Sequence, residues 1–276
     1  MTDDDVLALL RGPTRRVSIT VRDIGERLGR ALGGADMDVR DRERAIVIPV
    51  ADGTVAGDLG VPLGAATSGA PQGTPKVRGL VVLAAAGGSG RNDYRDRYLA
   101  GRLRMAGYAT LRLDLLMSAD HRRADDLSLG VDVGRLAARV GAACAWAIRA
   151  NITGARRTVL IGSGLAGAVA LVAAAEHPVS IWSVIARGAR VHLASHALTR
   201  VRAPVLLVVG AADHETAFAN AEARRKLPTG ARLVTIPHTG RDFDEPGTLG
   251  ALGEQVVSWL ERLEMRPSGG EHKGRA

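Results

Sequence analysis

The stretch TVLIGSGLAGAVALVAAAE, residues 158–176, decides the fold. It begins with a short β-branched and apolar run, residues 158–161, of the kind that forms buried parallel strands. Gly162, Gly164 and Gly167 then permit a tight turn, and the alanine-rich run that follows predicts a closely packed helix. The middle of the chain is therefore predicted to be a strand, a sharp glycine turn and a buried helix.

Two kinds of site are built on such a unit. In the nucleophile elbow G-x-S-x-G, a strained turn pushes a serine into a cleft. The dinucleotide-binding loop has the pattern G-x-G-x-x-G, which Gly162, Gly164 and Gly167 match. A dinucleotide site also needs an acidic residue about 20 residues further on, and residues 177–212 contain none. Arg187 ends the next expected strand and could meet a 2′-phosphate, so an NADP-binding protein is kept as an alternative function.

Length and composition fit one domain with a sizeable core. The chain has 276 residues, of which 46% are apolar, and its one cysteine, Cys144, lies in an apolar helical pattern. We therefore interpret Cys144 as a small core residue. No apolar stretch approaches the roughly 20 residues of a membrane span, and the acidic N-terminus does not resemble a secretory signal. These features predict a cytoplasmic protein without a membrane partner.

The net charge of +8 does not by itself indicate a nucleic-acid-binding protein. Nearly all the basic residues are arginines, most of them interleaved with Asp and Glu, and aromatic residues that could stack on bases make up 3% of the chain. The histidines show no metal-ligand spacing. The sequence therefore predicts no nucleic-acid partner, no metal and no cofactor.

Around the glycine turn, strands and helices alternate, which predicts a mostly parallel sheet covered by helices on both faces. Two strands, residues 44–50 and 54–61, come first and form an antiparallel hairpin through the Asp52-Gly53 turn. Further strands are expected at residues 79–85, 109–113, 158–161, 180–186, 204–209 and 232–236. Helices are expected at residues 94–106, 131–150, 168–175, 193–200, 217–227 and 248–263.

The chain divides into three predicted parts. Residues 1–40 contain two short amphipathic patterns, 3–10 and 21–32, and predict an N-terminal helical extension. Residues 41–265 form the α/β domain, and residues 266–276 are polar and glycine-rich, as in a disordered tail. The extension lies outside the α/β pattern and is the expected place for a protein partner.

Three stretches resemble the dienelactone-hydrolase-like branch of the α/β-hydrolase superfamily. They read GLVVLAAAGGSGRNDYRDRYLAGRLRMAGYATLRLDLL, VIARGARVHLASHALTRVRAPVLLVVGAAD and IPHTGRDFDEPGTLGALGEQVVSWL. The resemblance extends over residues 44–263. It implies an α/β-hydrolase fold, with a mostly parallel central sheet, helices on both faces and an N-terminal antiparallel hairpin.

The resemblance also implies where a catalytic triad would lie. Alignment of ALVAAAE with the helix after the family's G-A-S-T-G elbow places Gly164 at the nucleophile position. The stretch 237–247 has the length of the family's histidine loop, and Arg241 falls on the histidine. Asp213 follows VLLVVG at the position of the triad carboxylate. The acid position is thus retained, whereas the nucleophile and base positions are degenerate.

These substitutions are severe for the chemistry of the family. Ester hydrolysis by this fold needs a hydroxyl nucleophile, a base that takes its proton and a carboxylate that orients the base. Glycine supplies no nucleophile, and an arginine with a pKa above about 12 stays protonated at neutral pH. We therefore expect a catalytically inactive pseudo-hydrolase, in which Arg241 pairs with Asp213 and the cleft binds a small molecule or the surface docks a protein partner.

The expected ligand pocket lies between the elbow and the loop after the first parallel strand. Its predicted members are Gly87, Gly88, Ser89, Arg91 and Leu165. Because a guanidinium recognises carboxylate and phosphate groups, Arg91 favours an anionic ligand.

An active serine esterase or lactonase is the second alternative function. It would need relocated catalytic residues, namely Ser163 or Ser89 with Asp213 and His238. With Ser163 as the nucleophile, Ile161 and Leu165 would stand at the two elbow positions that normally hold glycine. These side chains would crowd the turn, so we expect Ser163 to be an ordinary turn residue.

Overall fold

The computed structural model describes residues 43–65, 76–87, 89–117, 120, 132–151, 157–228 and 230–265. The predicted N-terminal extension, residues 1–40, and the predicted tail, residues 266–276, lie outside this part of the chain, as does Gly88.

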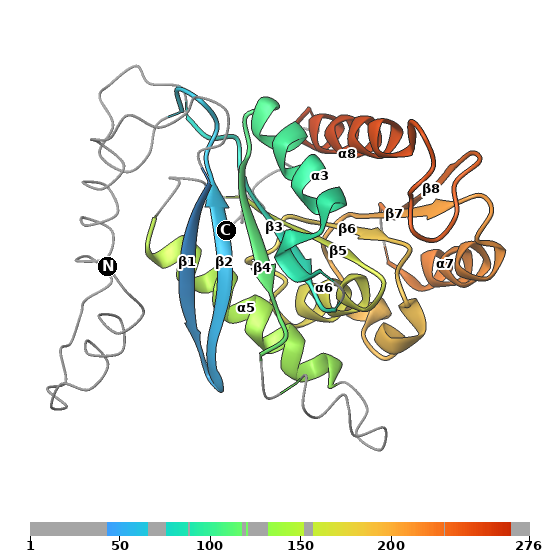
Figure 1. The fold of residues 1–276 in the computed structure, drawn as a ribbon. Coiled ribbons are helices and arrows are strands. Elements are labelled where there is room, and N and C mark those ends of the chain that lie inside the picture. Colours follow the sequence, from blue (N-terminus) through green and yellow to red (C-terminus); the bar gives the residue numbers. More distant parts are fainter. Residues whose placement is uncertain are drawn as a thin grey trace, which may run out of the picture.

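Eight strands form one mixed sheet in the order β1-β2-β4-β3-β5-β6-β7-β8 (Figure 1). β1 and β2 form the predicted antiparallel hairpin, and β2 pairs antiparallel with β4. From β4 to β8 every neighbouring pair is parallel, which confirms the predicted mostly parallel sheet. The strands are β1 (Glu43–Val50), β2 (Gly53–Gly60), β3 (Leu80–Ala85), β4 (Ala109–Asp114), β5 (Thr158–Ser163), β6 (Ser183–Arg187), β7 (Val205–Gly210) and β8 (Arg232–Ile236).

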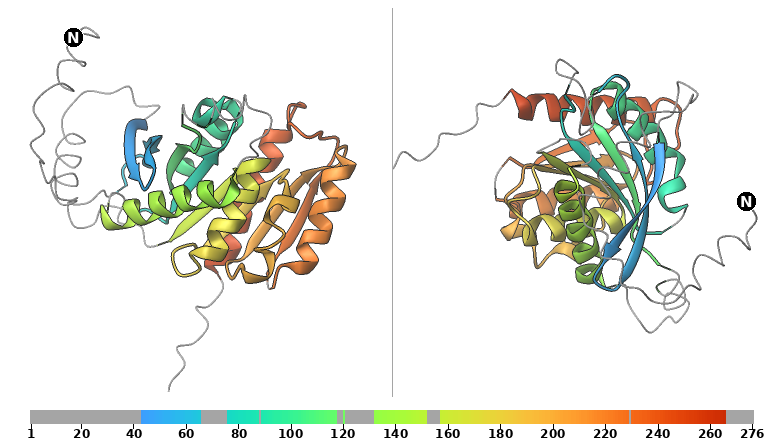
Figure 2. Two further views of the ribbon diagram at one scale, coloured as in Figure 1. Left: turned by 90° about the horizontal axis from the view of Figure 1, so that it is seen from below. Right: turned by 90° about the vertical axis from the view of Figure 1, so that its left-hand side faces the viewer.

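Helices cover both faces of the sheet (Figures 1 and 2). Successive strand residues point to opposite faces. Accordingly Val81 and Leu83 of β3 pack in one apolar cluster with α3 and α8, whereas Val82 and Ala84 pack in another with α5 and α6, to which residues of α7 also belong. The helices are α3 (Tyr94–Met105), α5 (Val133–Arg149), α6 (Leu165–Glu176), α7 (His214–Lys226) and α8 (Thr248–Glu264).

Aspartates begin three of these helices. The carboxylates of Asp93, Asp132 and Asp213 accept hydrogen bonds from backbone N–H groups in the first turns of α3, α5 and α7. Each carboxylate thereby satisfies one of the backbone donors that a helix leaves unpaired at its amino end. Helix α6 differs, because Gly164 precedes it and supplies no side-chain cap.

The prediction of a single helix at residues 193–200 is wrong. That segment forms two short 3-10 helices, η2 (Val191–Ala194) and η3 (Leu198–Arg200). The buried residues Val191, Ala194 and Ala197 recur at every third position. This spacing matches the three residues per turn of a 3-10 helix rather than the α-helical period.

Ion pairs of two buried arginines, Arg139 and Arg112, fasten the hairpin to the rest of the domain. Arg139 of α5 pairs with Asp52 in the hairpin turn at 2.6 Å and with Asp120 at 2.5 Å. At the other end of the hairpin, Arg112 of β4 pairs with Glu43 and, at 3.2 Å, with Asp58. Removal of one member of a buried pair leaves an uncompensated charge, so these contacts fix the hairpin in place.

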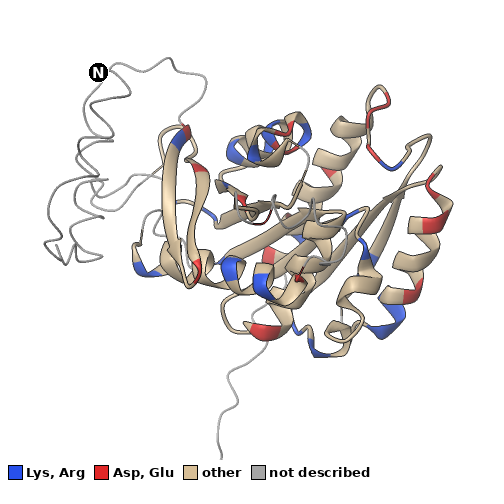
Figure 3. Cartoon of the chain, turned by 60° about the horizontal axis from the view of Figure 1, so that its bottom comes forward, with Lys and Arg blue, Asp and Glu red and all other residues tan. Residues whose placement is uncertain are grey.

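The remaining charges are dispersed, as the sequence predicts. In the view of Figure 3, Lys and Arg and also Asp and Glu are scattered over the described elements. Within the described part of the chain, no helix is long and apolar enough to cross a membrane. Cys144 lies inside α5 with 1% of its surface exposed, and burial raises the pKa of its thiol to about 12.

Candidate functional site

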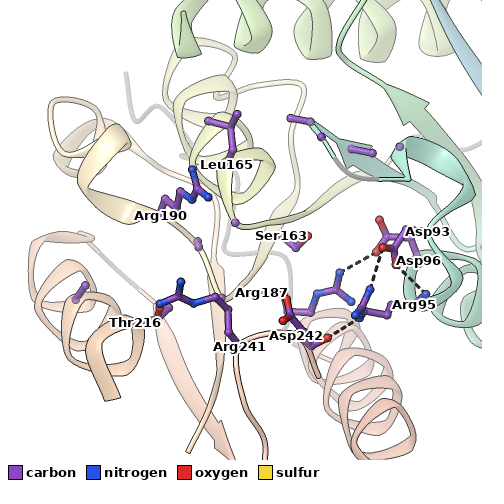
Figure 4. A pocket seen from close by; sticks show the side chains of 18 of the residues that line it. Asp93, Arg95, Asp96, Ser163, Leu165, Arg187, Arg190, Thr216, Arg241 and Asp242 are labelled. Atoms are coloured by element: carbon purple, nitrogen blue, oxygen red, sulfur yellow. Dashed lines mark hydrogen bonds and ion pairs between the residues drawn. The ribbon is translucent and has the colours of Figure 1, made fainter. Parts of the chain in front are cut away.

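A cavity of about 660 Å³ opens at the carboxyl ends of the parallel strands (Figure 4). Ala85 of β3, Ser163 of β5 and Arg187 of β6 line it directly where these strands end. The chain places β4 on one side of β3 and β5 on the other, so the path of the chain reverses at this point. In open α/β sheets, ligands bind at such a reversal.

The turn between β5 and α6 forms one wall of the cavity. Gly164 stands at its apex with φ 54° and ψ −116°, a conformation that residues with a side chain rarely adopt. A Cβ on Gly162 would lie 2.3 Å from the carbonyl oxygen of Ala166, and a Cβ on Gly167 would lie 2.7 Å from the Cβ of Ala189. Backbone geometry and packing thus account for all three glycines of G-x-G-x-x-G without a bound dinucleotide.

The apex itself is open. A Cβ built on Gly164 would meet no atom within 4 Å, so a side chain at this position would project into free space. Ser163 also lines the cavity, but it is the last residue of β5 and has no positive φ. Among the described residues, the strained apex position is therefore that of Gly164 and not that of Ser163.

Asp213 and Arg241 form the ion pair that the sequence analysis predicts. The Nε of Arg241 lies 3.1 Å from Oδ2 of Asp213, and the backbone N–H of Thr216 donates to Oδ1 at 3.3 Å. Burial, which raises the pKa of Asp213, is outweighed by these hydrogen bonds, so the pKa lies below its usual value. Arg241 is 64% exposed and lines the cavity, whereas the carboxylate of Asp213 is 8% exposed.

A second arginine–carboxylate pair lies deeper in the cavity wall. The Nη2 of Arg187 is 3.2 Å from Oδ1 of Asp96, and these two side chains are 7% and 12% exposed. The Nη1 of Arg187 is buried and has no hydrogen-bond partner among the described residues. Burial raises the pKa of Asp96, and the nearby charge of Arg187 opposes this shift only in part.

The loop that carries Arg241 is held against α3. Arg95 donates to the backbone carbonyl of Asp242 and to the carboxylate of Asp244, which also accepts a hydrogen bond from the hydroxyl of Tyr94. Arg95 pairs in addition with Asp93 at 3.1 Å. These contacts place the guanidinium of Arg241 at the rim of the cavity.

Only some of the predicted pocket residues line the cavity. Gly87 and Leu165 line the cavity, whereas Ser89 and Arg91 do not. The guanidinium of Arg91 is instead held by Asp58 at 3.1 Å and by Asp114 at 2.5 Å. Arg91 thus braces β2 and β4, and the expectation of an anionic ligand cannot rest on its charge.

The alternative catalytic set is not brought together around the cavity. Ser163 lines the cavity, but His238 lies exposed on the turn after β8, with φ 53°, and does not line it. Ser89 and Asp213 are likewise absent from the lining. Within the described ranges, no three His, Cys, Asp or Glu side chains are placed to hold a metal ion.

Sequence reasoning missed most of the charged and polar lining. These residues follow the ends of strands or lie in the first turns of helices, which is the one signal that could have pointed to them. They are Asp93, Arg95, Asp96, Arg190, His192, Glu215, Thr216 and Asp242.

No protein-family model matches the chain. It is 34% identical to a dienelactone hydrolase of Anabaena variabilis, with 81% of this chain and 98% of that chain covered and a TM-score of 0.71. The esterase Est1E of Butyrivibrio proteoclasticus shares the fold at 16% identity, with 80% of this chain and 98% of that chain covered and a TM-score of 0.62.

Proteins of two Mycobacterium tuberculosis strains, each named "putative phosphoribosyl transferase", are also 34% identical to the chain. The match extends over 260 residues, which are 94% of this chain and 53% of each relative. The chain therefore spans about half the length of these curated relatives.

Proposed function

Because the chain belongs to the dienelactone hydrolase family of α/β-hydrolases, we propose that it is a member that binds a ligand in the family cleft without hydrolysing it. The observation that carries this proposal is the apex of the elbow. Gly164 stands there with the strained backbone of a nucleophile position but without a hydroxyl group.

The other side of the cleft supports the same proposal. In a serine hydrolase the triad carboxylate orients a neutral histidine, which accepts the proton of the nucleophile. Here the carboxylate of Asp213 accepts a hydrogen bond from Arg241, which raises the pKa of that guanidinium. A guanidinium has no lone pair to accept a proton, so the pair closes the rim of the cleft and performs no general base catalysis.

Docking of a protein partner is the second form of the proposal. It is supported by the length of the mycobacterial relatives, in which the matched region is about half of the protein. In those relatives, whose name refers to a phosphoribosyl transferase, the matched domain is therefore joined to a further part of the same protein.

A cytoplasmic location is part of the same proposal, and cell fractionation tests it.

Ester hydrolysis tests the proposal directly. The substrate is a short activated ester, and the wild type is compared with Gly164→Ser/Arg241→His, which restores a hydroxyl at the open apex and an imidazole beside Asp213. We expect no turnover by the wild type above that of its Ser163→Ala variant, and a gain in the double variant.

Two further measurements separate the alternatives. Wild-type turnover that Ser163→Ala abolishes, or labelling of Ser163 by a fluorophosphonate probe, would show an active serine hydrolase and contradict the proposal. A rise in the melting temperature on addition of NADP, but not of adenosine, would favour the dinucleotide alternative.

A further inference from the structure

We propose that residues 21–32, which lie outside the described part of the chain, pack as an amphipathic helix on the uncovered face of the β1-β2 hairpin of the same chain. The inference concerns the edge of the sheet and does not depend on the cavity or on its proposed function. It gives the N-terminal extension a role as a cover of the sheet.

One face of the hairpin is covered and the other is not. Ile48 and Val55 are buried in the apolar cluster that contains residues of α5. Successive strand residues point to opposite faces, so the residues that alternate with these two point away from α5. We call the second surface the outer hairpin face, which consists of Ala45, Val47, Pro49, Thr54 and Ala56.

The outer hairpin face is mostly apolar and exposed. Val47, its largest aliphatic side chain, is 64% exposed, and the register places it opposite Ala56. In the views of Figures 1 and 2, α3 lies beside β4 rather than β1, and no helix of the described residues lies on the outer hairpin face. A sheet is normally stabilised by another layer on each apolar face. The described elements do not supply that layer here.

The segment that precedes β1 has the pattern of a helix with one apolar stripe. Its apolar residues recur at spacings of three and four, which places them on one side of a helix. They are Val21, Ile24, Leu28, Ala31 and Leu32. The segment therefore has one side to bury.

Charged residues fill the other side of the same segment. Opposite charges stand four residues apart, a spacing that stabilises a helix on its exposed side. These pairs are Arg22 with Glu26, Asp23 with Arg27, and Glu26 with Arg30. The charged side therefore suits contact with water while the apolar stripe packs on the sheet.

The ends of the segment also carry helix signals. Thr20 and Asp23 have the spacing of a capping box. Gly33 follows the last apolar residue, as is common at the carboxyl end of a helix. The pattern thus predicts a helix that begins and ends with the apolar stripe.

The length of the chain lets this helix reach the outer hairpin face. β1 begins at Glu43, whose carboxylate pairs with Arg104 of α3 at 2.6 Å, so the chain enters the sheet beside this face. Residues 33–42 link the helix to β1 and span up to about 33 Å when extended, whereas β1 is about 27 Å long. A helix of 12 residues, about 18 Å long, can therefore fold back along the hairpin.

Protection of a cysteine on the outer hairpin face tests the inference in the full chain. Val47→Cys is treated with a maleimide, and Met105→Cys, at a position 83% exposed on α3, gives the rate at an uncovered site. We expect Val47→Cys to react at least about tenfold more slowly at every protein concentration. Equal rates overturn the inference. Protection that disappears on dilution would identify a second copy as the cover and would overturn it as well.

A substitution in the segment identifies the occupant. Leu28→Asp, added to Val47→Cys, places a charge in the apolar stripe and should raise the labelling rate toward that of Met105→Cys. Gly29→Asp is the matched control, because it adds the same charge at the next position, which lies on the charged side of the helix. An equal rise in the two variants, or no rise with Leu28→Asp, overturns the inference.

Hydrogen exchange examines the contact from the side of the segment. Amide groups of residues 24–32 should exchange at least about tenfold more slowly in the wild type than in Val47→Asp. Val179→Asp is the control, since Val179 is 98% exposed and lies between α6 and β6. A segment without protection in the wild type, or with the same protection in Val47→Asp, overturns the inference.

Discussion

The two walls of the cavity are built on different principles. At the elbow, steric contacts of the backbone determine the structure, because a Cβ on Gly162 or Gly167 would overlap neighbouring atoms. At the opposite wall, side chains determine it, through the pair of Asp213 with Arg241 and the contacts of Arg95. The backbone contacts at the elbow do not depend on which side chain stands at the apex, whereas the opposite wall depends on the identity of both partners in each pair. The comparison shows that backbone packing holds one wall in place and that side-chain contacts hold the other.

Gly162→Ala should have the largest effect on stability, because it disrupts the backbone packing of the elbow. The added Cβ would lie 2.3 Å from the carbonyl oxygen of Ala166, so the elbow must shift or the chain must fail to fold. We expect the free energy of unfolding to fall by about 3 kcal/mol or more. Urea unfolding followed by circular dichroism measures the change.

Gly164→Ala is the matched control within the same turn. Its Cβ would meet no atom, so only the strain of the positive φ remains, about 1–2 kcal/mol. Equal losses in the two variants would show that packing does not distinguish these glycines and would refute the steric account of the elbow.

Arg187→Met should have the second largest effect, because it leaves Asp96 buried without its partner. Breaking such a pair costs about 3 kcal/mol at neutral pH. Burial raises the pKa of Asp96 and Arg187 opposes this, so the pKa should rise further in the variant. The neutral carboxyl group needs no counter-charge, and the loss should therefore shrink as the pH falls.

The pH dependence decides how this second prediction is interpreted. Chemical unfolding of the wild type and of Arg187→Met over a range of mildly acidic to neutral pH gives the difference directly. Arg190→Met is the control, since this exposed arginine of the same cavity forms no ion pair within the described residues. A loss that does not vary with pH would indicate lost packing rather than an uncompensated carboxylate.

Asp213→Asn should have the smallest effect. Asparagine still caps α7, so the variant removes the charge and keeps the cap. Hydrogen bonds from Arg241 and Thr216 outweigh the effect of burial and lower the pKa of Asp213, so its contribution is present above roughly pH 4 and is lost as the pH falls through the lowered pKa. At neutral pH the variant should be less stable by up to about 1 kcal/mol.

Measurements of stability at acid pH test the direction of the pH dependence in this third prediction. The stabilities of the wild type and of Asp213→Asn should converge as the pH falls through the lowered pKa of Asp213, below which both side chains are neutral. Arg241→Ala, which removes the same pair from the other side, should show the same convergence. A difference that grows as the pH falls would exclude the ion pair as its cause.

Most of the fold could be predicted from the sequence, because local patterns carry it. The expected strand at residues 232–236 is β8, and the turn chemistry of Asp52-Gly53 gives the hairpin of β1 and β2. The segment after β6 was predicted incorrectly, since its apolar residues at every third position also fit an α-helix over one turn. Patterns of one or two turns do not separate these two helix types.

The candidate site could be predicted only in part. The pairing of Asp213 with Arg241 followed from the family resemblance, which places two loops side by side that the sequence separates by 28 residues. No such guide existed for Arg187 and Asp96, which lie 91 residues apart, or for Arg91, which looks like a pocket residue and instead pairs with Asp114. Contacts of this kind depend on how loops pack, and a pattern along the chain does not contain that information.

The burial of Cys144 makes the domain a convenient subject for site-specific labelling. It is the one cysteine of the chain, and with a pKa raised to about 12 its thiol is scarcely ionised at neutral pH. Because the thiolate is the reactive form, maleimide reagents should leave it unmodified in the folded protein. A cysteine introduced at the rim of the cavity would therefore be the single site that accepts a fluorophore, and its emission could report ligand binding in the native chain.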